Sequence, residues 1–98
     1  MIHALAAVGK NIRNVAENKM QRKFSLKQGQ YLAFIYNYTK IHGRPPAEAD
    51  LEGYFQVAFS SIHQMILRLE RRRLITRIPG EARSIRVLLS PEELPHLK

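Results

Sequence analysis

The sequence predicts a mainly α-helical domain that carries a small β-hairpin near its end. Three observations lead to this fold class. Apolar residues recur at helical spacing after Ser25, a second helical region follows Pro45-Pro46, and two β-rich stretches meet at Pro79-Gly80. At 98 residues the chain is long enough for one small domain with one core.

The first helix of this core is expected over residues 26–42. Ser25 is a favourable N-cap, because its hydroxyl can accept a hydrogen bond from an amide of the first turn. Gly43 suits the left-handed position that closes a helix, and the two prolines after it prevent the helix from continuing. The apolar positions expected on its packed face are Leu32, Ile35, Tyr36, Tyr38, Thr39 and Ile41, with Phe34 near the edge. This helix should be the scaffold of the domain.

A short acidic helix is expected next, over residues 47–55. Pro46 can occupy the first position of this helix, where the missing N–H is not needed for a helical bond. Glu48 and Asp50 lie near the positive end of the helix dipole, which favours negative charge. The residues expected on its buried face are Leu51, Tyr54 and Phe55.

A third helix is expected over residues 60–72, after a tight turn at 56–59 and with Ser60 or Ser61 as its N-cap. The stripe with the spacing of a packed face comprises Ile62, Met65, Ile66 and Leu69. The opposite face comprises Ser61, His63, Gln64, Leu67, Arg68 and Arg71. Polar side chains gather at the N-terminal end, which is the part that a recognition helix inserts into the major groove of DNA.

Two β-rich stretches, residues 74–78 and 84–89, are expected to form a hairpin through the turn at 79–82. The arginines of this hairpin are Arg77, Arg83 and Arg86, with Arg83 at its tip. Arginines in such a place usually contact the sugar-phosphate backbone, and they position a protein on DNA without reading its sequence. Two helices joined by a turn and followed by a basic hairpin therefore predict a DNA-binding module.

The net charge of +8 is unevenly distributed. Residues 1–24 hold five Lys/Arg and one Glu, and residues 62–88 hold seven Arg and two Glu. The charges of residues 25–61 balance. Two basic segments on either side of a neutral one indicate a polyanionic partner such as nucleic acid, although the same charge is also compatible with a basic protein that binds no polyanion.

Several segments in this order are similar to one known family. They are Arg44-Pro45-Pro46, the helix-turn-helix after it, Leu69-Glu70-Arg71-Arg72 leading into Leu74-Ile75, and Pro79-Gly80-Glu81-Ala82-Arg83-Ser84-Ile85-Arg86. Together they resemble the DNA-binding domain of LexA-type repressors, which is marked by a G-R-P-P stretch, a helix-turn-helix, an L-E-R-K-G-L-I turn and a G-x-x-R-x-I-R wing. The resemblance covers about residues 25–89.

The resemblance implies a three-helix winged helix-turn-helix that binds double-stranded operator DNA in the bacterial cytoplasm, at the nucleoid, and represses transcription. It places helix 60–72 in the major groove and wing 76–87 on the backbone. Base-reading positions fall at Ser60, Ser61, His63 and Gln64, to which the outward Arg68 is added. The arginines expected on the DNA backbone are Arg44, Arg71, Arg72, Arg77, Arg83 and Arg86.

The sequence also departs from the family. Arg73 and Gln56 stand where the family usually has glycine, and the turn near Gln56 is one residue shorter. The self-cleaving serine-lysine peptidase domain is not found in these 98 residues, so a stand-alone form of the DNA-binding domain is expected. Self-cleavage and the operator sequence of the family are therefore not expected to carry over.

Residues 1–24 are expected to form a basic helical extension, and residues 90–98 a tail. The spacing of Leu5, Val8, Ile12 and Val15 is helical. Such a helix could pair two subunits as a homodimer, place its basic side chains against DNA, or pack on its own domain. Fewer than three heptads and Gly9 argue against a stable coiled coil.

Other classes of function find little support. The chain has no cysteine, and the four histidines are scattered without ligand spacing, so we expect no metal site and no cofactor. No glycine-rich phosphate loop or catalytic triad can be assigned, which argues against an enzyme. No apolar run reaches the length of a membrane span, and no signal peptide is evident. The alternative function is a winged-helix module that binds protein or structured RNA.

Overall fold

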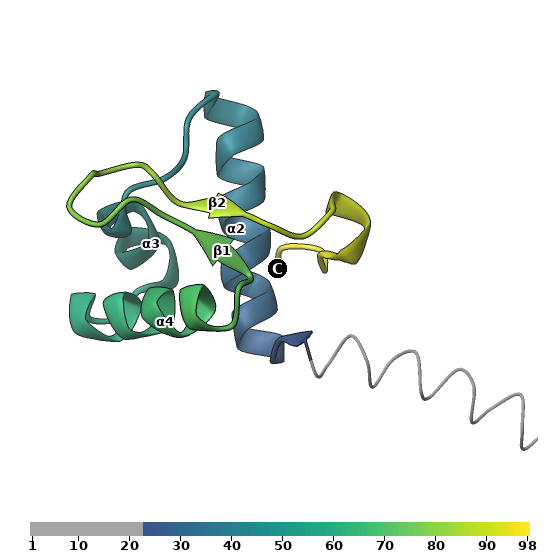
Figure 1. Ribbon diagram of the computed structural model, residues 1–98, viewed down its shortest axis with the longest axis horizontal. Coiled ribbons are helices and arrows are strands. Elements are labelled where there is room, and N and C mark those ends of the chain that lie inside the picture. Colours follow the sequence, from purple (N-terminus) through teal and green to yellow (C-terminus); the bar gives the residue numbers. More distant parts are fainter. Residues whose placement is uncertain (1–22) are drawn as a thin grey trace, which may run out of the picture.

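Within residues 23–98, which the computed structural model describes, three helices pack around one core and a hairpin closes it on one side (Figure 1). The elements in order are α2 (Leu26–His42), α3 (Glu48–Phe55), α4 (Phe59–Arg71), β1 (Ile75–Thr76), β2 (Arg86–Val87) and the 3-10 helix η1 (Pro91–Glu93). This is the predicted fold class, mainly α with a small hairpin. The predicted N-terminal helix and its possible dimer contacts lie outside the described residues.

Local signals set both ends of α2, and its predicted bounds are confirmed. The Ser25 hydroxyl accepts a hydrogen bond from the Gln28 amide at 3.1 Å, and the Gln28 side chain accepts one from the Ser25 amide at 2.9 Å. This reciprocal capping box satisfies two amides that a helix start otherwise leaves unpaired. At the other end Gly43 adopts φ 73° and donates to the Thr39 carbonyl at 2.8 Å.

The central part of α2 is enclosed on all sides. Five successive residues from Tyr31 to Ile35 are buried, because α3 and α4 lie on one side of the helix and the hairpin and C-terminal segment cover the rest (Figure 1). Ile41 was predicted on the packed face and is instead 76% exposed. The prediction was wrong because the last turn of α2 projects beyond the elements that pack on it (Figure 1).

Helix α3 begins one residue later than predicted, with Ala47 as its N-cap and Pro46 before it. The Asp50 carboxylate accepts a hydrogen bond from the Ala47 amide at 2.8 Å, which is half of a capping box. Leu51 is buried as expected, and Phe55 stacks on Tyr31 with ring centroids 4.2 Å apart. Tyr54, expected on the buried face, is exposed at the rim.

Helix α4 begins at Phe59 with Ala58 as N-cap, so the predicted cap at Ser60 or Ser61 was wrong. Gln56 closes α3 in a left-handed conformation with φ 56°, which leaves a shorter turn than expected. A serine cap contributes about 1 kcal/mol, so packing can override that preference. The predicted inward stripe is confirmed, because Ile62, Met65, Ile66 and Leu69 are all buried.

The hairpin is shorter than its sequence suggested. Two residue pairs align in antiparallel register, Ile75 with Val87 and Thr76 with Arg86. The long loop between the strands extends to the side of the domain where α3 lies (Figure 1), and Arg83 of the loop bonds to Pro45 and Asp50 at the start of that helix. Its residues are held by side-chain bonds, among them Ile78 N–H to the Ser84 hydroxyl at 2.9 Å, rather than by a strand ladder.

The C-terminal segment packs along α2. The Gln30 side chain donates to the His96 carbonyl at 2.9 Å and accepts from the Lys98 amide at 2.8 Å. Leu94 and Leu97 pack against the core. Residues 90–98, predicted as a tail, therefore contribute to the packed structure.

Candidate nucleic-acid interface

The outward face of α4 is open along most of its length. The exposed members of the predicted base-reading set are Ser60, Ser61, Gln64 and Arg68. Three of these four belong to the first two turns, because the helix starts at Phe59. The buried stripe on the opposite side fixes the orientation of this face, since the same helix cannot turn without exposing four apolar side chains.

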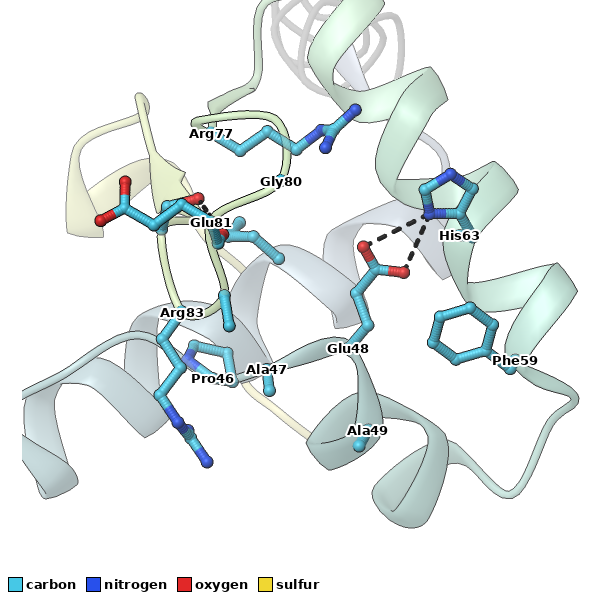
Figure 2. Close-up of a pocket in the computed structure, with 13 residues that line it drawn as sticks. Pro46, Ala47, Glu48, Ala49, Phe59, His63, Arg77, Gly80, Glu81 and Arg83 are labelled. Atoms are coloured by element: carbon cyan, nitrogen blue, oxygen red, sulfur yellow. Dashed lines mark hydrogen bonds and ion pairs between the residues drawn. The ribbon is translucent and has the colours of Figure 1, made fainter.

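His63, also predicted to read bases, is half-buried and already has a partner. Its Nδ1 lies 3.0 Å and 3.3 Å from the two carboxylate oxygens of Glu48 (Figure 2). An ionised carboxylate can only accept hydrogen bonds, so this contact places the proton on Nδ1 and leaves Nε2 for any other partner. The sequence reading missed this pair, because it assigned Glu48 to the helix dipole alone.

Phe59 is a surface residue that the sequence reading also missed. It is 52% exposed and forms the first residue of α4. Its ring lies parallel to the His63 ring, with 9° between the planes and 6.2 Å between the centroids (Figure 2). The missed signal was the four-residue spacing of Phe59 and His63, which puts the two side chains on one face of a helix.

An open hollow separates the start of α4 from the wing loop. Phe59 and His63 line one side, Glu48 and Ala49 of α3 form another part of its wall, and Gly80 to Ile85 complete it from the wing (Figure 2). The proposed reading helix and the wing therefore border one shared depression.

The two arginines nearest this hollow on the wing are held within the fold. Arg83 Nη1 donates to the Tyr38 hydroxyl at 3.2 Å, the Pro45 carbonyl at 3.3 Å and Asp50 Oδ2 at 3.0 Å. Arg77 Nε donates to Glu70 Oε1 at 3.1 Å, and its side chain is only 16% exposed. Arg83, expected at an outward tip, points into the fold and away from the hollow (Figure 2).

Asp50 connects the wing to α3. Burial raises the pKa of its carboxyl, but the Ala47 amide and the Arg83 guanidinium more than offset this, so the pKa lies below its ordinary value. A lowered pKa means that the ionised form is preferred in the folded protein. Asp50 therefore holds the first turn of α3 and the wing loop through the same charged group.

The remaining arginines differ in their surroundings. Arg72 is tied to α2, because its Nη1 donates to Gln28 Oε1 at 3.0 Å. Five other arginines are exposed. Arg68 and Arg71 belong to α4, Arg86 belongs to β2, and Arg44 and Arg73 lie in the connecting loops. Arg73 adopts φ 61°, in the left-handed region that favours glycine.

Two further classes of site find no support among residues 23–98. No group of three or more His, Asp or Glu side chains in that range is arranged to hold a metal ion. No helix of the described range combines the length and apolarity needed to cross a membrane.

Comparison with known proteins shows which family this chain is related to. No protein-family model matches the chain. The LexA repressor of Bartonella quintana is 36% identical over 69 residues, which are 69% of this chain and 29% of that protein. The LexA repressor of Exiguobacterium sibiricum is 36% identical over 76 residues, which are 76% of this chain and 37% of that protein. The chain thus spans about a third of the length of these relatives.

The departures from the family predicted at Gln56 and Arg73 coincide with left-handed backbone, with φ 56° and 61°. Glycine adopts this conformation without strain, so both positions have the backbone that favours glycine although other residues occupy them. The shared sequence and the three helices with a hairpin agree, and the chain is therefore a LexA-like protein whose described part is a winged helix.

Proposed function

We propose that the chain is a sequence-specific transcriptional regulator, a repressor, that reads double-stranded DNA with α4 in the major groove. The single observation that carries the proposal is the division of α4 into one buried stripe and one open polar face. Its relatives are repressors by name, which supports the same role here. A protein of this kind acts at the bacterial nucleoid, in the cytoplasm.

The open face of α4 has side chains suited to base edges. Gln64 can make paired hydrogen bonds to adenine, and Arg68 can make paired bonds to guanine. Ser60 and Ser61 can donate to or accept from several base edges. His63 has only Nε2 left for DNA, because Nδ1 is bound by Glu48.

We assign contacts with the DNA backbone to those arginines whose side chains are exposed. Arg44, Arg71 and Arg86 have exposed side chains and can approach phosphates. Arg77 and Arg83 serve in our proposal as internal supports that hold the wing, since their guanidinium groups are bound by Glu70 and Asp50. This divides five of the six arginines that the sequence assigned to the backbone, and the sixth, Arg72, donates to Gln28 of α2.

Paired variants test the division between base and backbone contacts. A preferred duplex is first selected from a randomised library and then compared with random duplex. Gln64→Ala should cost about 1 to 3 kcal/mol on the selected duplex and little on random DNA. Arg71→Ala should weaken both duplexes alike, and the slope of log K against log salt should fall by about one. Equal losses for both variants on both duplexes would contradict the division.

Failure to bind any duplex at low salt would favour the alternative, a protein- or RNA-binding module.

Half-site spacing in the selected duplex tests the predicted homodimer. One winged module buries about 600 to 1,000 Å² on DNA, so a linked second copy would raise avidity. We propose residues 2–20 as the pairing segment. Two half-sites and a dimer in sedimentation are expected, and a monomer at tens of micromolar would exclude that role.

A further inference from the structure

We propose that Phe59 reads thymine at this interface, through contact of its ring with the C5-methyl group in the major groove, and that Glu48 and His63 hold the ring in place. The inference rests on the proposed function, because it requires α4 to enter the groove. It adds a specificity residue and names the base that the residue selects.

The position of Phe59 fits a base contact. It is the first residue of α4, and the N-terminal end of a recognition helix is the part that approaches base edges. His63, one turn further on, lies on the same face as Phe59, and Ser60 and Ser61 belong to the same first turn of the helix. Single exposed apolar residues are common, and the place of this one beside the readers is what distinguishes it.

The ring of Phe59 is supported from one side. It lies parallel to the imidazole of His63 at 6.2 Å between centroids, and that imidazole is held by both carboxylate oxygens of Glu48. The order of support therefore runs from α3, through Glu48 and His63, to Phe59. At this separation the two parallel rings are offset, so the imidazole lies beside the phenyl ring and Phe59 remains 52% exposed.

The chemistry of the major groove leaves one suitable target for an apolar ring. Each base pair presents hydrogen-bond donors and acceptors there, and thymine alone adds a methyl group. A phenyl ring cannot hydrogen-bond to the polar edges, but it gains by removing a methyl group from water. Phe59 should therefore prefer thymine to cytosine and to uracil.

Replacement of thymine by deoxyuridine tests the inference, because it removes the methyl group and nothing else. Each thymine of the selected duplex is replaced in turn, and the dissociation constant of the full chain is measured. We expect one position in each half-site at which the replacement weakens binding about three- to tenfold, the effect of one buried methyl group. The same replacement should change the affinity of Phe59→Ala less than twofold.

Three further variants make the result specific. Gln64→Ala should bind more weakly yet keep the deoxyuridine effect, because its contact is to another base. Glu48→Ala should reduce the deoxyuridine effect while the salt slope stays unchanged, since Glu48 acts as a positioning residue through His63. Phe59→Leu, which keeps an apolar side chain, should retain part of the effect and guards against a loss of folding in Phe59→Ala.

The outcomes separate the two proposals. If no preferred duplex can be selected, the proposed function fails and the thymine contact fails with it. If a preferred duplex is selected but no deoxyuridine position matters, the Phe59 inference alone is overturned. It is equally overturned if the deoxyuridine effect persists unchanged in Phe59→Ala.

Discussion

Helices α2 and α4 of this winged helix differ in how much of their surface is enclosed. In α2 five successive residues, Tyr31 to Ile35, are buried, so this helix has no face left for a partner over its centre. In α4 four residues at helical spacing are buried and the opposite side is open. Both helices therefore contribute to the core, but α4 alone of the two combines a buried stripe with an open face.

The ends of the two helices show the same difference. Helix α2 has a complete capping box at Ser25 and a glycine at its C-terminal end. Helix α4 starts at Phe59, the side chain of its N-cap Ala58 makes no capping hydrogen bond, and Arg73, two residues after its end, has a left-handed conformation. Local sequence preferences therefore stabilise α2, whereas α4 depends on tertiary packing.

The largest expected effect is in the buried stripe of α4. Leu69→Ala should lower the free energy of unfolding by about 2 to 5 kcal/mol, because it leaves a cavity at a fully buried position. Leu67→Ala, on the half-exposed face of the same helix, should cost clearly less. Urea denaturation measures both. Equal costs would mean that the two faces do not differ as described.

A glycine pair tests how tightly α2 is enclosed. A Cβ at Gly29 would lie 2.9 Å from Phe24 Cε1 and 3.1 Å from Pro95 Cγ. Gly29→Ala should therefore destabilise the protein by about 1 to 3 kcal/mol through overpacking. Gly53→Ala in α3 meets nothing within 4 Å and should stabilise by about 0.5 to 1 kcal/mol. A gain in thermal stability from both variants would contradict the enclosure of α2.

The left-handed position of Arg73, two residues after α4, should tolerate glycine better than arginine. Arg73→Gly should stabilise the fold by about 1 kcal/mol, because φ 61° is strained for a residue with a Cβ. The same exchange five residues earlier, Arg68→Gly, lies inside α4 and should destabilise by about 0.5 to 1 kcal/mol. Chemical denaturation of the two variants should move the midpoint in opposite directions. Shifts of the same sign would show that backbone strain is not the cause.

The smallest effects are expected at the helix starts. Ala58→Ser should stabilise by about 0.5 to 1 kcal/mol, because Ala58 already has extended backbone and a serine hydroxyl can bond a first-turn amide. Ser25→Ala should cost a similar amount by removing the capping box of α2. Melting temperatures of the two variants give the measurement. A loss of stability in Ala58→Ser would mean that the start of α4 is fixed by other contacts.

The sequence predicts some of these features better than others. The ends of α2 depend on neighbours in the chain, so Ser25 and Gly43 indicated them correctly. The packed stripe of α4 follows from the spacing of its residues alone. The start of α4 was misplaced because two serines matched a cap preference that packing overrides.

Contacts between elements could not be predicted in this way. Periodicity tells which side of a helix is buried, but not which side chain of another element meets it. The Arg83 bond to Tyr38 joins residues 45 apart, and the His63 contact with Glu48 joins residues 15 apart. For this reason the sequence assigned Arg83 to an outward tip and His63 to free base reading.

The Asp50 carboxylate has a further consequence for the protein as a whole. It accepts from the Ala47 amide at the start of α3 and from Arg83 in the wing loop. In the proposed complex, the distance between the part that enters the major groove and the part that contacts the DNA backbone is therefore fixed before DNA binds. A duplex with a different groove width would have to deform to fit. Folding lowers the pKa of Asp50, so its ionised carboxylate stabilises the folded protein at pH values above the ordinary aspartate pKa. This stabilisation is lost as the pH falls and the carboxylate is protonated.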